Sequence, residues 1–174
     1  MSPPANAEAQ NPVQFDELYR DLILDHYRNP RNKGDLDDAA IVVEGFHPSC
    51  GDEVRVALRL DDGTVSEIRF GGSGCSISQS SASMLTEEIV GRPLDEVRTL
   101  SRAVQHMLTD EGFDLDSTDV GDLEALSGVA RFPVRIKCAL LAWKVLDQAL
   151  QQVDGADPDG TEDDSDIQTR IATN

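Results

Sequence analysis

Three short apolar runs in the first half of the chain, each bounded by turn residues, constrain its fold most. In the second run, apolar residues alternate with arginine and alanine from Val54 to Leu60, the period-2 pattern of a strand with one buried face. Asp62 and Gly63 follow, and both types accept the positive φ angles of a type I′ hairpin turn. The sequence therefore predicts three antiparallel strands, at 41–43, 54–60 and 65–70.

Segments with helical periodicity lie on both sides of the strands. The first covers 15–29 and stops at Asn29-Pro30, and after the strands we predict helices at 75–90, 93–108 and 133–153. Residues 123–126 are expected to form at most a short turn of helix. Strands that are grouped apart from helices indicate an α+β fold, in which helices pack on one face of a three-stranded antiparallel sheet.

The chain of 174 residues has the length of one domain, with polar segments at both ends. Residues 1–14 are polar and lack any period, which predicts a disordered leader. Seven acidic residues lie between Asp154 and Asp166 without an apolar period, which predicts an acidic disordered tail over 154–174. The folded domain is therefore expected at 15–153.

Acidic residues outnumber basic ones, 33 against 15, and the formal net charge is −18. Phosphates would repel such a chain, so nucleic acid and anionic membrane surfaces are not expected partners. No apolar stretch reaches the length of about 18 residues that spans a membrane. The first 14 residues lack the basic and apolar regions of a secretory signal, so the expected location is the cytoplasm.

Three cysteines, an odd number, cannot all pair within one chain, and a reducing compartment favours metal binding or chemistry over disulfides. Three unrelated buried thiols are the simplest alternative. Cys50 lies in a loop with Pro48, Gly51 and Asp52, and side chains two residues apart in an extended backbone point the same way. The Cys50 thiol and the Asp52 carboxylate can therefore converge on one cation.

The other two cysteines lie where thiolates are favoured. Cys75 follows three glycines and begins a helix, whose amino end carries partial positive charge. A phosphate-binding loop is the weaker interpretation of these glycines, because no Lys-Ser/Thr pair follows them. Cys138 lies in the first turns of the last helix, near Arg135 and Lys137, whose charges also favour a thiolate.

Three thiolates and the Asp52 carboxylate form a donor set that suits tetrahedral zinc or an iron–sulfur fragment. The cysteines are separated by 25 and 63 residues, spacings that no zinc finger has. The fold must therefore assemble any metal site from distant segments.

Five ordered motifs between residues 15 and 150 resemble the SufU branch of the U-type iron–sulfur assembly proteins. They are Leu18-Tyr19-Arg20-Asp21, His26-Tyr27-Arg28-Asn29-Pro30-Arg31-Asn32, Cys50-Gly51-Asp52, Gly72-Ser73-Gly74-Cys75 and Arg135-Ile136-Lys137-Cys138. The resemblance implies an α+β fold with a three-stranded antiparallel sheet. It also implies a metal site made of Cys50, Asp52, Cys75 and Cys138.

Two branches share that fold, and the resemblance distinguishes them at the third cysteine. Scaffold proteins similar to IscU carry Leu-Pro-Pro-Val-Lys there and a histidine directly before the cysteine, whereas this chain has Arg-Phe-Pro-Val-Arg at 131–135 and Lys137. The connection at 110–126 is also typical of the SufU branch. The resemblance thus implies a zinc-dependent sulfurtransferase. The alternative is a scaffold on which an iron–sulfur cluster is assembled and transferred.

The resemblance further implies the partners and a course for the reaction. A SufS-like, PLP-dependent cysteine desulfurase donates persulfide sulfur, and one of its histidines takes over a zinc position and frees Cys50. Cys50 accepts the sulfur as in thiol–disulfide exchange and passes it to a SufBCD-like cluster assembly complex. Asp52 tunes the charge at the zinc, and Arg135 contacts the desulfurase.

Three histidines and one lysine complete the candidates. His47, three residues before Cys50, is expected as a partly exposed loop residue, with metal ligation as the alternative. His26 and His106 are expected at the surface or at an interface. Lys137 can pair with Asp52 or remain solvated, and the sequence leaves both open.

Overall fold

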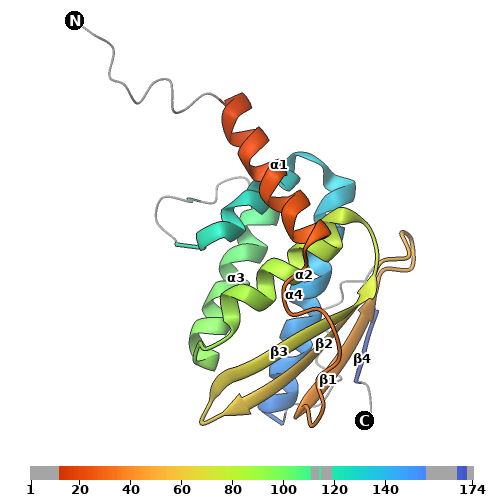
Figure 1. Cartoon of the computed structure of the whole chain (residues 1–174), viewed down its shortest axis with the longest axis vertical. Coiled ribbons are helices and arrows are strands. Elements are labelled where there is room, and N and C mark those ends of the chain that lie inside the picture. The colour runs from red at the N-terminus through yellow and green to blue at the C-terminus, as the bar shows by residue number, and fades with distance from the viewer. Residues whose placement is uncertain (1–11, 111–113, 115–118, 156–167, 172–174) are drawn as a thin grey trace, which may run out of the picture.

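The computed structural model describes residues 12–110, 114, 119–155 and 168–171. Within these ranges a sheet and a group of helices form two packed layers (Figure 1). The elements in chain order are α1 (Pro12–Arg28), β1 (Ile41–Phe46), β2 (Glu53–Asp61), β3 (Thr64–Ser73), α2 (Ser76–Ile89), α3 (Leu94–Thr109), the 3-10 helix η3 (Gly121–Arg131), α4 (Pro133–Val153) and β4 (Gln168–Ile171).

The sheet is antiparallel, with strand order β3-β2-β1-β4. The three predicted strands and their hairpin are confirmed, since Asp62 and Gly63 have φ angles of 49° and 75° at the turn between β2 and β3. Each predicted strand is longer than its apolar run, because backbone pairing continues past the buried residues. The α+β class is confirmed as well.

The sheet has four strands, so the prediction of three is wrong. The additional strand is β4, which pairs with β1 from Phe46↔Gln168 to Val43↔Ile171. Because β4 lies within the predicted disordered tail, that prediction is wrong for 168–171, while 156–167 lie outside the described residues. A four-residue edge strand is held by backbone pairing and needs no apolar pattern of its own.

Helix α1 begins at Pro12, a residue type that is favoured in the first turn, three residues before the predicted start of the domain. The rest of the predicted leader, 1–11, lies outside the described residues. Between α3 and α4, η3 spans 11 residues, so the expectation of a short turn was wrong. Its buried Leu123, Leu126 and Val129 pack into the common core, which supplies the stabilisation that its sequence alone does not.

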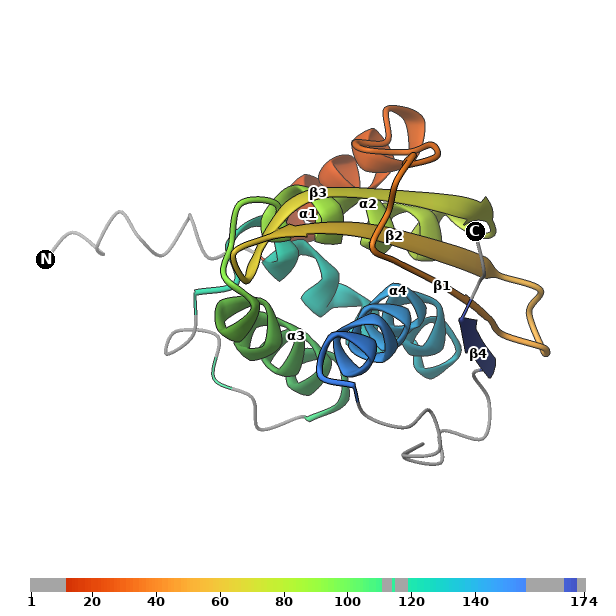
Figure 2. The same ribbon diagram turned by 90° about the horizontal axis from the view of Figure 1, so that it is seen from below.

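Helices α2 and α4 pack against the sheet, α1 packs against α2 and η3, and α3 packs against α4 and η3. Figure 2 shows α3 and α4 on one side of the sheet and the connection from α1 to β1 on the other. That connection contacts the outer face through Asp35, which pairs with Arg55. The single-faced helix packing predicted from the sequence is confirmed, and no helix in the described part of the chain is long and apolar enough to cross a membrane.

Small residues on α2 let its neighbours come close. Ser81 accepts a hydrogen bond from the Trp143 indole at 3.1 Å and donates one to the Ala139 carbonyl at 2.7 Å, which ties α2 to α4. Ser80 donates to the Ile23 carbonyl of α1 at 2.6 Å. Buried hydroxyls are tolerated here because each finds a partner. The α2 serines are thus packing residues, as the sequence predicted.

His26 is buried, at 1% exposure, so its expected surface position is wrong. Its Nδ1 lies 2.8 Å from Ser83 Oγ, which also accepts a hydrogen bond from the Arg31 amide. The imidazole thereby joins α1 to α2 and to the turn that follows α1. Burial, and then the Arg31 guanidinium, hold the pKa of His26 below its ordinary value of 6.5.

We expect the free energy of unfolding to fall as the pH drops below 6.5, because the unfolded chain then binds a proton that buried His26 resists. The stability contribution of neutral His26 is fully present above the pKa that His26 has in the unfolded chain. It is lost, by up to about 1.4 kcal/mol per pH unit, as the pH falls toward the lower pKa that His26 has in the folded protein. Urea unfolding of the wild type and of His26→Asn measures it, and the difference between the two should shrink with falling pH. His106→Asn, at an exposed position, is the control, and a pH-independent difference for His26→Asn would contradict the prediction.

Candidate metal and sulfur site

Three segments that are distant in sequence bring the cysteines together at one end of the sheet. Cys50 lies in the loop between β1 and β2, Cys75 directly precedes α2, and Cys138 lies in the second turn of α4. Their exposure differs, since Cys50 is exposed, Cys75 is half-buried and Cys138 is buried. The structure thus assembles all three predicted cysteines, and it does so through the fold.

Asp52 lies at the centre of the group and is 3% exposed. Its Oδ2 lies 3.3 Å from Cys50 Sγ and 3.6 Å from Cys75 Sγ. Its Oδ1 accepts a hydrogen bond from the Cys75 amide at 2.9 Å. Donor atoms of Cys50, Asp52 and Cys138 all lie within 4.8 Å of one another. The four residues therefore form one cluster around a single carboxylate.

The loop that carries Cys50 is closed by backbone hydrogen bonds at its base. The His47 amide donates to the Asp52 carbonyl at 2.9 Å, and the amides of Cys50 and Gly51 donate to the His47 carbonyl. Gly51 has a φ of +74°, which glycine adopts without strain. The Cys50 side chain therefore projects from a tight turn, whereas Asp52 directly precedes β2.

Cys75 and Cys138 are held by helices. The Cys75 carbonyl accepts the Gln79 amide at 3.1 Å, so its thiol lies at the positive end of α2. Cys138 Sγ lies 3.9 Å from the Val134 carbonyl one turn earlier in α4. Of the three thiols, these two are the less mobile, and Cys50 is the one that a loop movement can displace.

The ionisation of the cluster is coupled. Burial raises the pKa of Asp52, but hydrogen bonds from the Cys75 amide and from the three thiols outweigh it and bring this pKa below its ordinary value. Burial raises the pKa of Cys138 strongly, and the neighbouring Asp52 and Cys75 raise it further. From the sequence, Arg135 and Lys137 were expected to lower the pKa of Cys138 and so favour its thiolate. In the protein without a metal ion, burial raises this pKa instead, so that expectation was wrong. Several thiolates beside this carboxylate require a cation.

The donor set fits zinc. Zinc binds sulfur at about 2.3 Å and carboxylate oxygen at about 2.0–2.2 Å, so tetrahedral donors lie roughly 3.3–3.8 Å apart. The distances from Asp52 Oδ2 to the thiols of Cys50 and Cys75, 3.3 and 3.6 Å, are of this size. Cys50, Asp52 and Cys138 have mutually close donor atoms, and Cys75 joins them through its approach to Asp52, so the four residues offer an S3O set for the ion.

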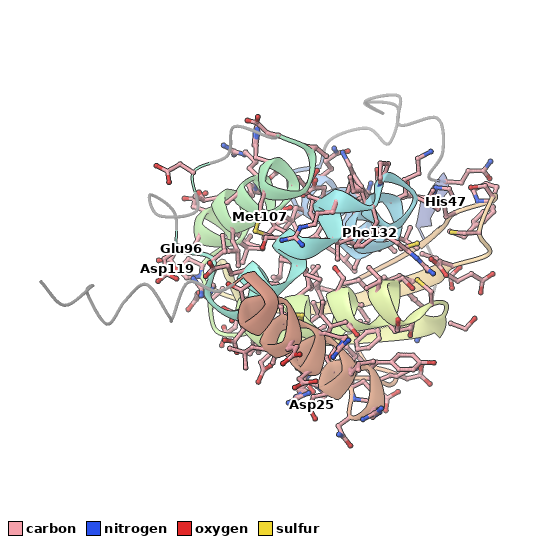
Figure 3. All side chains as sticks on the ribbon, turned by 90° about the horizontal axis from the view of Figure 1, so that it is seen from above. Asp25, His47, Glu96, Met107, Asp119 and Phe132 are labelled. Atoms are coloured by element: carbon pink, nitrogen blue, oxygen red, sulfur yellow. The ribbon has the colours of Figure 1, made fainter. Side chains whose placement is uncertain are left out.

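The other candidates lie around this cluster. His47 is buried, at 2% exposure, so its expected exposure is wrong, and Figure 3 shows it where β1 meets the Cys50 loop. Its Nδ1 pairs with Ser49 Oγ at 2.7 Å, and its Nε2 has no partner within the described residues. Arg135 and Lys137 are exposed on the first turns of α4. Just before them the chain exposes Phe132 and Val134, at 61% and 79%, and Figure 3 shows Phe132 at the surface.

Sequence reasoning missed the role of Gly74 in this site. A Cβ on Gly74 would lie 2.6 Å from Asp52 Oδ1 and 2.5 Å from Ser78 Oγ, so only glycine leaves room for the carboxylate. We expect Gly74→Ala to displace Asp52 and to lower zinc affinity by about 10- to 100-fold, the usual effect of disturbing residues that support metal ligands. Competition with a chromogenic chelator measures this affinity.

Gly71→Ala is the matched control. Gly71 lies three residues earlier, its φ is not positive, and a Cβ there would meet no atom within 4 Å. We expect its zinc affinity to equal that of the wild type. Equal affinities for Gly74→Ala and Gly71→Ala would show that Asp52 does not need the space beside Gly74.

A cavity of about 710 Å³ lies on the outer face of the sheet, next to this cluster but separate from it. Its lining includes Phe46, Glu44, Glu53, Gly71 and Gln168, and none of the four predicted ligands. The cluster itself is accessible at the surface through Cys50.

Comparison with known proteins agrees with this geometry. The chain matches the family of the NifU-like N terminal domain over residues 18–156. The zinc-dependent sulfurtransferase SufU of Bacillus subtilis (strain 168) is 46% identical over 143 residues, which cover 82% of this chain and 96% of that protein. The iron–sulfur cluster assembly scaffold protein IscU of Thermotoga maritima is 37% identical over 139 residues, which cover 80% of this chain and 96% of that protein.

A solved structure is similar as well. The crystal structure of a proposed iron–sulfur cluster assembly scaffold protein for the SUF system, from Fervidobacterium islandicum AW-1, has a TM-score of 0.69 and 32% identity to this chain. The match covers 74% of this chain and 93% of that one.

Proposed function

The chain belongs to the family of NifU-like N-terminal domains and is a U-type iron–sulfur cluster assembly protein, and from this premise we propose that it is a zinc-dependent sulfurtransferase. In this proposal it accepts persulfide sulfur from a PLP-dependent cysteine desulfurase. It then passes the sulfur to a SufBCD-like cluster assembly complex. The observation that carries the proposal is the single exposed thiol, Cys50, in a cluster whose other donors are buried or held by helices.

The zinc ligands in this proposal are Cys50, Asp52, Cys75 and Cys138. Zinc supplies positive charge that keeps thiols deprotonated and holds the loops around them in place. The protein's own groups do not supply such a charge at Cys138, since burial and Asp52 raise its pKa. The buried position of Cys138 thus supports a resident cation.

Cys50 is the sulfur acceptor. Its thiolate attacks the outer sulfur of the desulfurase persulfide, a new S–S bond forms at Cys50, and the bond to the desulfurase cysteine breaks. The desulfurase cysteine leaves as a thiolate, and Cys50 carries the persulfide, so no external oxidant or reductant is required. The turn at His47–Asp52 lets the Cys50 side chain meet a partner without moving β1 or β2.

Asp52 keeps the rest of the cluster in place while Cys50 reacts. Its Oδ1 bond to the Cys75 amide does not involve the Cys50 thiol, so this contact remains when Cys50 turns toward a partner. Its Oδ2 lies near the thiols of both Cys50 and Cys75. Asp52 is therefore suited to hold the charge of the site constant during the transfer.

The start of α4 is the surface that we assign to the desulfurase. Phe132 and Val134 expose apolar side chains, and Arg135 adds a cation for a partner carboxylate. Exposed apolar groups beside a charged rim are typical of protein interfaces. Because Cys138 follows in the same helix, a partner that docks here lies next to the cluster.

A scaffold for an iron–sulfur cluster is the second candidate, favoured by the similarity to IscU of Thermotoga maritima. Thiolate and carboxylate ligands suit an iron–sulfur fragment as well as zinc. The sequence favours the sulfurtransferase, since Lys137 stands where the scaffold motif has a histidine.

Metal and sulfide analysis of the protein purified anaerobically without added metal separates the two candidates. We expect about one zinc per chain, as a single S3O site binds, with no acid-labile sulfide. A stoichiometric content of iron and sulfide in place of zinc would support the scaffold and overturn the sulfurtransferase.

A further inference from the structure

Strand β4 lies outside the part of the chain that the family shares. The family match ends at residue 156, and β4 begins at Gln168. The alignment with SufU of Bacillus subtilis covers 96% of that protein but only 82% of this chain. An additional segment of this chain therefore covers the edge of β1, on the side away from β2 and β3 (Figures 1 and 2).

This edge leads directly to the Cys50 loop. Gln168 pairs with Phe46, and the next residue, His47, begins the loop whose base is closed by hydrogen bonds to Asp52, Cys50 and Gly51. Any segment that pairs with β1 at Phe46 therefore ends at the base of the Cys50 loop. An edge strand offers a row of backbone donors and acceptors to such a segment.

The occupant of this edge is short. Strand β4 has four residues, and within the described elements it pairs with β1 and has a small contact with α4. The described structure ends at Gly155 before β4 and resumes at Gln168, so 12 residues, rich in acids, connect them. A four-residue strand on so long a connection is readily exchanged for another extended segment.

The neighbouring cavity indicates the chemistry of a competing segment. On the outer face it is lined by acidic Glu44 and Glu53, by the exposed ring of Phe46, and by Gln168 and Thr169 of β4. Arg55 also lines it, but Asp35 neutralises its charge in an ion pair. The register places a basic residue of β4, Arg170, opposite Glu44. A segment that places a basic residue opposite Glu44 complements this edge, because oppositely charged cross-strand neighbours stabilise a pair.

We propose that the edge of β1 is a docking site for an extended, basic segment of a partner protein, and that β4 occupies it in the free chain. The partner adds a strand to the sheet, a recognition mode in which the backbone supplies affinity and alternate side chains supply specificity. Docking displaces β4 and brings the partner to the base of the loop that carries Cys50. Only this last step rests on the proposed function, since pairing at β1 is independent of sulfur transfer.

Hydrogen exchange of the full chain tests whether β4 occupies the edge of β1. The variant Thr169→Pro/Arg170→Pro lacks two adjacent backbone amides of β4. Because successive amides of a strand point to opposite sides, one of the two must be the amide that faces β1. We expect exchange of peptides that cover Val43–Phe46 to rise by at least about tenfold, with β2 unchanged. The control variant Thr161→Pro/Glu162→Pro has two prolines in the segment between α4 and β4. Its exchange at Val43–Phe46 should match that of the wild type. Equal exchange in both variants would show that β4 does not hold the edge.

A synthetic peptide with the sequence of residues 166–174 then tests the docking site in the proline variant. We expect it to restore protection at Val43–Phe46, and we expect a version with Arg170→Glu to protect at least about tenfold less at equal concentration. No protection by either peptide would overturn the docking site, and equal protection by both would overturn the basic specificity. Neither measurement uses a desulfurase, so the results do not depend on the proposed function.

Discussion

Replacing Cys50 by serine is expected to abolish sulfur acceptance while leaving a folded protein. The hydroxyl is a far weaker nucleophile than a thiolate, so we expect stimulation of cysteine desulfurase turnover to fall by at least about 100-fold. Cys50 is exposed in a loop and is not a member of the buried hydrophobic core, so its loss removes little buried contact. Alanine production from cysteine, followed with and without the variant, measures the effect.

Cys50→Ser should also retain part of its zinc, because Asp52, Cys75 and Cys138 remain. The zinc content of the variant therefore shows whether only the sulfur acceptor is lost or the whole metal site is lost. A Cys50→Ser protein that still stimulates the desulfurase at the wild-type rate would show that sulfur transfer uses another thiol.

Replacing Cys138 by serine is expected to affect metal and stability together. Its thiol is buried in α4, 3% exposed, and next to Asp52. Removing a fixed ligand should lower zinc affinity by more than about 100-fold, beyond the 10- to 100-fold effect of changes around a site. Metal binding contributes folding free energy, and a loss of about 3 kcal/mol lowers the Tm of a domain this size by roughly 10 °C.

Calorimetry with and without a chelator checks this expectation. The wild type should lose stability on chelation, whereas Cys138→Ser should melt at the same temperature in both conditions. Cys50→Ser is the matched control, and without chelator its Tm should lie between those of the wild type and Cys138→Ser. If chelation destabilises Cys138→Ser as much as the wild type, Cys138 is not a ligand.

The sheet shows which features a sequence can predict. Alternation at 54–60 and the Asp62-Gly63 turn each have a local physical cause, and both were confirmed. Strand β4 has no such pattern, because its stabilisation comes from an unpaired edge that exists only after β1 has joined the sheet. Local periodicity could not reveal it.

Burial of single polar residues was equally hard to predict. His26 lies on a helix with many charged residues, and its burial goes with contacts to Ser83 and Glu87 of α2, which are distant in sequence. His47 is buried by the loop that its own backbone closes. In both cases the deciding contact is tertiary, so composition and spacing indicated exposed histidines.

The candidate site was predictable in its chemistry but not in its geometry. A carboxylate two residues from a cysteine indicated a shared cation, and the structure places Asp52 at the centre of the thiols. The effect of Arg135 and Lys137 on Cys138 was misjudged, because burial outweighs nearby surface charges. The space that Gly74 leaves for Asp52 depends on the approach of β2 to α2, which no local pattern encodes.

The central claim is that Cys50 carries the sulfur, and mass spectrometry of the chain after reaction with a cysteine desulfurase and cysteine tests it most directly. After alkylation and proteolysis, we expect the mass of one added sulfur atom on the peptide that contains Cys50. The peptides of Cys75 and Cys138 should remain unmodified. Sulfur on either of these peptides, with none on Cys50, would contradict the assignment.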